Sequence, residues 1–239
     1  MHDKSGKTPI WQAIADALRS DLAEGKYAPG DKLPTEAALA ERFGVNRHTV
    51  RHGISALVEE GLIRTRRGSG AFVAATPTDY PIGQRVRFHE NLIAAGRRPD
   101  KRVLQIEMRA ATTGEAKALQ IAPGDPICAY HGLSLSDRQP IAVFESLFPL
   151  GRLSSISAAL SQTSSVTEAL RLAGVSDYTR ASTRLTAVRA TATHALHLQL
   201  SEGDPLLKSS GVNVDEFGAP VEFGRTWFAG DRVTLTLEV

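Results

Sequence analysis

The sequence predicts an α+β protein in two parts: an N-terminal winged helix-turn-helix, followed by an antiparallel sheet with helices. Three segments with helical spacing of apolar residues precede two short strands near residues 62–73. Farther along the chain, one ten-residue pattern occurs twice, with a spacing of 79 residues from Gly124 to Gly203. The length of 239 residues also exceeds one typical domain of roughly 100–200 residues. We therefore expect two domains.

The composition is that of a globular protein with a buried core, because 42% of the residues are hydrophobic and 23% are charged. No apolar run approaches the roughly 20 residues of a membrane span, and the polar segment 1–7 leads into no apolar signal segment. Cys128 is the only cysteine, which excludes an intramolecular disulfide and a zinc cluster of cysteines. We expect a cytoplasmic protein without a membrane anchor.

Three helices and a hairpin are expected at the start of the chain. Apolar residues recur every three or four positions over 9–24, which indicates a helix. Thr35 can cap a second, short helix that ends at Gly44, and Asn46 can cap a third helix with its apolar residues on one face. Two short strands around a basic, glycine-rich turn follow over 62–73. This order of elements is typical of a winged helix-turn-helix.

The excess of positive charge lies in this first part. Residues 1–73 carry eleven Lys and Arg against nine Asp and Glu, whereas residues 74–239 carry seventeen of each. Within 42–67, six arginines stand against two glutamates. A basic run alone is often only a solvated face, but within a helix-turn-helix pattern it suits a polyphosphate. We expect this part of the chain to bind nucleic acid.

The third helix carries the strongest functional signal. Polar side chains fill its start: Asn46, Arg47, His48, Thr49, Arg51 and His52. The apolar residues of the helix face the other way. The major groove of DNA admits one α-helix, Arg pairs bidentately with guanine, and Thr can meet a base or a phosphate. We therefore expect Arg47 and Arg51 to contact DNA, the alternative being an amphipathic helix with a basic outer face.

The hairpin and the start of the second helix are expected to contact the DNA backbone. Arg66 and Arg67 precede Gly68, and a glycine lets the backbone approach a phosphate or the minor groove. The alternative is an ordinary hairpin turn. Thr35 and Glu36 can place a backbone amide on a phosphate, although Thr35 can also act only as a helix cap.

The second part of the chain is expected to fold from two similar halves. Each copy of the repeated pattern is followed by an alternating strand, a turn and a further apolar strand. The repeat either has only a structural role in folding or forms a functional cleft between the two halves. The expected boundaries are a DNA-binding domain over 1–74, a linker over 75–84 and a second domain over 85–239.

Several motifs together resemble the GntR family of bacterial transcription regulators. The segments similar to its DNA-binding domain are 33–36, 43–51 and 60–63. The second part resembles the UTRA domain, the effector-binding domain of the HutC subfamily. UTRA domains have a fold like that of chorismate lyase. Its matching segments are 124–126, 203–207, 220–223 and 230–232. Within the subfamily, the segments most like phosphonate-operon repressors of the PhnF type are 46–49, 79–81 and 87–92.

This resemblance implies a ligand-responsive DNA-binding regulator, most often a repressor. We expect a homodimer, because one recognition helix reads only a short half-site, whereas two helices related by a twofold axis read an inverted repeat in double-stranded operator DNA. The resemblance implies no catalytic residue, no metal and no cofactor. The family's DNA contacts carry over to Arg47, His48, Arg51 and the wing residues 67–68. Ala37 stands where many members have an arginine, which removes a possible guanine contact.

For the small-molecule effector, the resemblance implies a cleft built from two strands and a helix start. Its candidate residues are His131, Ser134, Ser164, Ser165, Glu222, Thr226 and Phe228. Relatives that bind phosphonates or anionic sugars often have arginines where His131 and Ser134 stand, and a tyrosine where Phe228 stands. Backbone amides after Ser165 can bind an oxyanion. Glu222 can accept a hydrogen bond from the ligand or form a salt bridge within the domain.

The alternative function is an enzyme of chorismate-lyase-like fold fused to a DNA-binding module. The residues give it little support, because Cys128 has no neighbouring His or Asp in a catalytic motif. His194 and His197 can share a helix face, but no third metal ligand is suitably spaced.

Three arginines of the second part can supply a counter-charge for an anionic effector or remain solvated: Arg184, Arg189 and Arg225.

Overall fold

The computed structural model describes residues 9–66, 68–74, 77–83, 88–94 and 96–237. The chain divides into two units, Met1–Thr76 and Pro77–Val239. Among the described residues, no helix is both long enough and apolar enough to cross a membrane.

The first unit is a winged helix-turn-helix, as predicted. Its elements are α1 (Ile10–Ala23), α2 (Glu36–Phe43), α3 (Arg47–Glu59), β1 (Ile63–Arg66) and β2 (Gly70–Val73). The three helices enclose a small core in which Leu18, Leu39 and Leu57 are fully buried. The strands β1 and β2 pair antiparallel, with Arg66 opposite Gly70 at the tip of the hairpin. This hairpin is the wing.

Local contacts place α3 on the rest of the first unit. The Asn46 side chain caps α3 by accepting a hydrogen bond from the Thr49 backbone N–H at 2.9 Å. Gly53 lets α1 approach closely, since a Cβ there would stand 2.9 Å from the Trp11 carbonyl oxygen. The Trp11 ring also stacks on His52, with 4.3 Å between the ring centroids. The close approach at Gly53 and the ring contact of Trp11 fix α3 against α1, while Arg47 and His48 at its start remain exposed.

The second unit is an α+β domain around one six-stranded sheet. Its helices are α4 (Phe88–Ala94), α5 (Thr113–Leu119), α6 (Ile156–Gln162), α7 (Val166–Leu172) and α8 (Ala192–Leu198). Its strands are β3 (Thr78–Pro81), β4 (Pro99–Ala110), β5 (Pro126–Ser136), β6 (Gln139–Pro149), β7 (Tyr178–Arg189), β8 (Pro205–Asp215), β9 (Pro220–Ala229) and β10 (Val233–Thr236). The large sheet has the antiparallel order β4-β5-β6-β9-β8-β7.

The order of the sheet is symmetric about the β6–β9 pair, and the repeated sequence pattern explains this symmetry. One half runs β4, α5, β5, β6, and the other runs β7, α8, β8, β9. The helices α5 and α8 begin alike, because Thr112 and Thr191 both cap them through a side-chain oxygen. They also end alike, with Gln120 and Gln199 in the left-handed conformation at φ 54°. The two copies of the repeat are thus equivalent structural halves.

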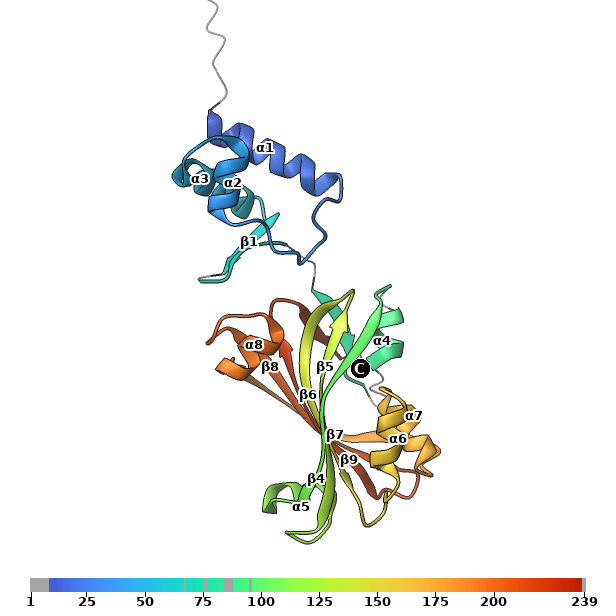
Figure 1. Cartoon of the computed structure of the whole chain (residues 1–239). Coiled ribbons are helices and arrows are strands. Elements are labelled where there is room, and N and C mark those ends of the chain that lie inside the picture. Colours follow the sequence, from blue (N-terminus) through green and yellow to red (C-terminus); the bar gives the residue numbers. More distant parts are fainter. Residues whose placement is uncertain (1–8, 67, 75–76, 84–87, 95, 238–239) are drawn as a thin grey trace, which may run out of the picture. The chain divides into compact units, whose positions relative to one another are not determined.

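The helices cover both faces of the sheet. Figure 1 shows α5 and α8 on one side and α4, α6 and α7 on the other. Side chains alternate along β5, so Ile127 and Ala129 pack with α5, whereas Cys128 and Tyr130 pack with α6 and α7. The register of each strand therefore decides which of its residues belong to which face.

One strand lies inside the segment 75–84, which the sequence predicts to be a linker. Residues 78–81 form β3, which pairs in parallel with β10, and the Thr78 N–H donates to the Arg232 carbonyl oxygen at 2.8 Å. Tyr80 of β3 is only 4% exposed, and its ring lies 5.2 Å from the ring of Phe228. This part of the segment therefore belongs to the second unit and contributes to its packing.

Candidate nucleic-acid interface and ligand cavity

A groove of about 620 Å³ lies on the first unit, between the start of α2, the start of α3 and the wing. The predicted DNA-contacting residues that line it are Thr35, Glu36, Arg47, Arg51, Arg66 and Gly68. Its concave shape and its three arginines suit a polyanion that reaches both a helix and a hairpin.

The first turn of α3 presents two exposed side chains and one that belongs to the cap. Arg47 and His48 are exposed. Thr49 is half-buried, and both its backbone N–H and its hydroxyl donate to Asn46 Oδ1, at 2.9 and 3.0 Å. Thr35 has a similar local role, since its hydroxyl oxygen accepts from the Ala38 N–H at 3.2 Å. The two threonines therefore stabilise the helix starts that carry the basic residues.

Arg51 and Glu36 form a two-bond ion pair across the groove wall. Arg51 Nε donates to Glu36 Oε1 at 2.9 Å, and Nη2 donates to Oε2 at 2.6 Å. The guanidinium lowers the pKa of the Glu36 carboxyl below its usual value, so the carboxylate stays ionised. Both residues are sequence-based candidates, but the ion pair between them was not predicted. Glu36 fixes the direction of the Arg51 side chain, which remains 60% exposed.

The wing supplies a third arginine. Arg66 lies over the ring of Phe72, with 4.6 Å from its guanidinium carbon to the ring centroid. Gly68 is exposed and has a positive φ of 75°, a conformation that glycine adopts without strain. Arg67 lies outside the described residues. Lys32 also lines the groove, and it is absent from the sequence-based candidates because it lies in a loop without a motif.

The second unit contains a cavity of about 230 Å³ on the side of the sheet that carries α4, α6 and α7. Five of the predicted effector-binding residues line it: Ser134, Ser165, Glu222, Thr226 and Phe228. They come from β5, from β9 and from the residue that caps α7. Tyr80 and Tyr178 add phenol groups from β3 and β7.

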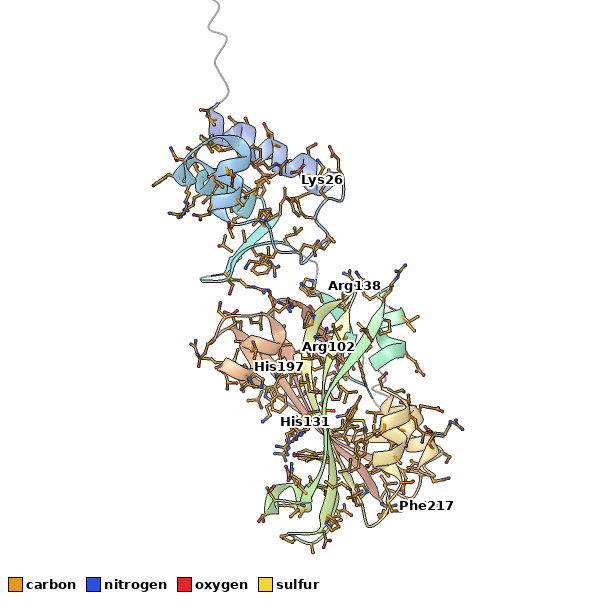
Figure 2. All side chains as sticks on the ribbon, in the orientation of Figure 1. Lys26, Arg102, His131, Arg138, His197 and Phe217 are labelled. Atoms are coloured by element: carbon orange, nitrogen blue, oxygen red, sulfur yellow. The ribbon has the colours of Figure 1, made fainter. Side chains whose placement is uncertain are left out.

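The structure places two predicted effector residues elsewhere. His131 lies on the side of the sheet that carries α5 and α8, as Figure 2 shows, with Nε2 3.7 Å from Glu107 and 3.9 Å from Glu145. Because strand residues alternate between faces, His131 and Ser134, three positions apart on β5, cannot both face the cavity. Ser164 is not among the lining residues, and its carbonyl oxygen accepts from the Tyr130 hydroxyl at 3.3 Å.

Glu222 is the buried carboxylate of the cavity, with 7% of its surface exposed. Its Oε1 accepts from the Ser146 hydroxyl at 2.5 Å, and its Oε2 accepts from the Asn213 amide at 2.6 Å. Two neutral donors thus hold the carboxylate in place, which leaves acceptor capacity on both oxygens for a ligand.

Two cations of the cavity are absent from the sequence-based candidates. Lys101 on β4 and Arg180 on β7 both line it. Burial lowers the pKa of Lys101 to about 8. The sequence-based candidate Arg225 instead pairs with Glu115 and Glu145. The spacing of the repeat could have identified the two cations, because positions 101 and 180 are 79 residues apart.

The described residues show no arrangement for catalysis through a metal or a thiol. No group of three His, Cys, Asp or Glu residues among them could hold a metal ion. Cys128 is fully buried, and this burial raises its pKa to about 11, so that the thiol stays protonated at neutral pH.

Known proteins match this chain over almost its whole length. Residues 11–73 match the family of bacterial regulatory proteins called gntR, and residues 94–234 match the UTRA domain. A helix-turn-helix transcriptional regulator of Rhizobium meliloti is 37% identical, over 96% of this chain and 94% of its own length. PhnF of Escherichia coli is 31% identical, over 95% of this chain and 94% of its own.

Two further comparisons agree. The repressor MngR of the mannosyl-D-glycerate transport and metabolism system of Escherichia coli is 30% identical, over 97% of this chain and 96% of its own. The crystal structure of PhnF from Mycobacterium smegmatis has the same fold, with a TM-score of 0.63 and 22% identity over 95% of this chain and 98% of that chain. The chain therefore belongs to the GntR family, carries a UTRA domain, and is a transcriptional regulator and not an enzyme.

Proposed function

We propose that this regulator is a repressor that binds operator DNA through the groove of the first unit and releases it when a small metabolite enters the cavity of the second. The observation that carries the proposal is the groove, where Arg47, Arg51 and Arg66 stand on one concave surface. The relationship to a named repressor supports the negative mode of regulation.

In this proposal α3 enters the major groove. Arg47 and His48, both exposed at its start, reach base edges or phosphates, and Arg51 reads a guanine in the direction that Glu36 sets. The wing holds the backbone through Arg66, Arg67 and the exposed Gly68. The caps at Thr35 and Asn46 stabilise these helix starts.

The affinity for operator DNA that a repressor needs supports a homodimer. One recognition helix reads only a short half-site, whereas two helices related by a twofold axis read an inverted repeat. In this proposal the second unit carries the dimer interface, and the protein acts in the cytoplasm, where the operator is. A ligand in the cavity favours an arrangement in which the two helices no longer match successive grooves. Such coupling between two binding sites is typically worth about 1–3 kcal/mol. Bound DNA must then lower the affinity for the ligand by the same factor by which the ligand lowers the affinity for DNA.

The cavity suits a small polar effector, for which an alkylphosphonate is the first class to test. Ser134, Ser165 and Thr226 offer hydroxyl groups, Glu222 offers an acceptor, and Phe228 offers an apolar wall. The likeness to PhnF supports the choice of phosphonates.

The test is a titration of a labelled DNA fragment from upstream of the regulator's own gene, repeated with alkylphosphonates, phosphosugars and urocanate. We expect tight binding to one inverted repeat and release by one of these compounds. A protein that binds every DNA equally, or binds the repeat more tightly with each compound, would contradict repression by release. Turnover of a compound would contradict a regulator altogether.

A further inference from the structure

The cavity of the second unit lies where the two halves of the sheet meet, and its two cations occupy equivalent positions in those halves. Lys101 on β4 stands opposite Ser134 on β5. Arg180 on β7 stands opposite Asn213 on β8. Both pairs differ by the 79 residues of the repeat (101 to 180, 134 to 213). The strands β4 and β7 are the two edges of the sheet, so each half sends one cation from its edge strand into the shared cavity.

A glycine at equivalent positions makes room for each cation. Gly132 and Gly211 are also 79 residues apart. A Cβ on Gly132 would stand 2.6 Å from Cζ of Phe144, whose ring carries the Lys101 ammonium 5.0 Å above its centroid. A Cβ on Gly211 would overlap the guanidinium of Arg180. The bare backbone on both halves therefore lets the two side chains reach inward over the sheet.

Arg180 has unused hydrogen-bonding capacity. Its Nε is buried and has no hydrogen-bond partner among the described residues. A guanidinium has five N–H donors, and a buried donor without an acceptor costs free energy that a bound acceptor would restore. Lys101 has a related cost, because burial disfavours its charged form and a bound anion would offset that cost.

The two halves differ in one important group. On the second half, Glu222 of β9 stands opposite Asn213. On the first half, Ala142 of β6 stands opposite Ser134. The cavity therefore has a cation on each half but a carboxylate from the sheet on only one. The helices α4 and α7 add Glu90 and Glu168 to the lining, so a ligand of this cavity needs acceptor oxygens for the two cations and a donor for the buried Glu222.

We propose that the effector is a small organic anion that also carries a hydroxyl or an amino group. Lys101 and Arg180 bind its anionic group from the two halves, and Glu222 accepts a hydrogen bond from its donor group. This inference rests on the proposed function, because it specifies the ligand class of the same cavity. The volume of about 230 Å³ is below the roughly 300–1,000 Å³ of drug-sized sites, which favours a compact metabolite.

The first test uses the full-length protein and inorganic phosphate at pH 7, with thermal unfolding and calorimetry at an ionic strength kept constant with sodium chloride. We expect phosphate to raise the melting temperature and to bind saturably. Lys101→Met and Arg180→Met should each weaken binding at least tenfold, and Lys101→Arg should restore most of it. The matched control is Lys117→Met, which removes an exposed charge on α5 outside the cavity. No effect of phosphate, or the same effect in Lys101→Met as in the wild type, would overturn the inference.

The second test compares 2-aminoethylphosphonate, ethylphosphonate and ethanolamine. The aminophosphonate should bind most tightly, Glu222→Gln should remove its advantage over ethylphosphonate, and ethanolamine should not bind. Equal binding of the two phosphonates would overturn the part of the proposal that concerns Glu222.

Operator titrations without any ligand separate the two proposals. If the operator is bound and released by some compound, but anion binding ignores Lys101 and Arg180, only the anion site fails. If anions bind as expected but the operator is neither bound nor released, the repressor function fails and the anion site stands. Wild-type melting behaviour of each variant without ligand shows that the variant is folded.

Discussion

The two candidate sites of this regulator are built in opposite ways. The groove of the first unit takes its lining from one stretch of chain, between Lys32 and Ala71, around two helix starts and one turn. The cavity of the second unit takes its lining from residues between Tyr80 and Phe228, which only the pairing of many strands brings together. A site of the first kind can be predicted from local sequence patterns. A site of the second kind depends on strand register and on the face of the sheet that each residue occupies.

The difference also affects the way each site holds its charges. Arg51 is exposed, so its charge is solvated, and it also forms an ion pair with Glu36. In the cavity, Arg180 keeps a buried Nε without a hydrogen bond among the described residues, and Lys101 has a lowered pKa. An ion pair thus holds the direction of the arginine in the groove, whereas the arginine in the cavity keeps a buried donor that no described residue satisfies.

The largest expected effect concerns the independence of the two units. Leu57 is fully buried in the core of the first unit, so Leu57→Ala should lower the free energy of unfolding of that unit by about 2–5 kcal/mol. The two tryptophans, Trp11 and Trp227, report the two units separately in urea titrations of Trp11→Phe and Trp227→Phe backgrounds. Only the Trp11 transition should move, and the exposed Leu172→Ala should move neither. A joint shift of both transitions would show that the units unfold together.

The next effect separates recognition from sensing. Arg47→Ala removes an exposed side chain at the start of α3 and should weaken operator binding by about 1–3 kcal/mol, with relaxed preference at one base pair. Anion binding by the cavity should stay unchanged. Anisotropy titrations with the operator and with single-base variants measure the first effect, and Lys117→Ala is the control. An operator affinity equal to the wild type would remove Arg47 from the interface.

The third effect uses pH to test the cavity alone. Burial lowers the pKa of Lys101 to about 8, so its ammonium is charged below that pH and neutral above it. Binding of sulfate, whose charge is constant in this range, should therefore weaken roughly tenfold between pH 7 and pH 9. Lys101→Arg should flatten this dependence, and an equally steep dependence in that variant would assign it to another group.

The smallest effect concerns the wing. Neutralising Arg66 and Arg67 together should lower the slope of log affinity against log salt by about one for each phosphate that the wing no longer neutralises. Affinity should fall alike for operator and unrelated DNA, because interactions with the phosphate backbone carry no sequence information. An unaltered slope with the double variant would mean that the wing does not hold phosphates.

The sequence was sufficient to predict the fold class and six of the residues that line the groove, because caps and helical periodicity are local. The Asn46 cap and the outward side of α3 needed no tertiary information. The ion pair between Glu36 and Arg51 was not predictable in the same way, since it joins residues of two different helices that are fifteen positions apart in the sequence.

The cavity was harder to predict because its residues depend on alternation. His131 and Ser134 were expected at one site, although their spacing on a regular strand sends them to opposite faces. Lys101 and Arg180 lie on edge strands without a motif of their own. The repeat contained the signal for both, but only the paired register shows that equivalent positions meet in one cavity.

The strand β3 links the cavity to the beginning of the second unit. Tyr80 lines the cavity and stands three residues after Pro77, where the second unit begins. A compound that contacts this phenol would therefore touch β3, the strand with which the second unit begins and which pairs with β10. Substitutions around the Tyr80 ring should therefore alter the wall of the cavity and the β3–β10 pairing at the same time.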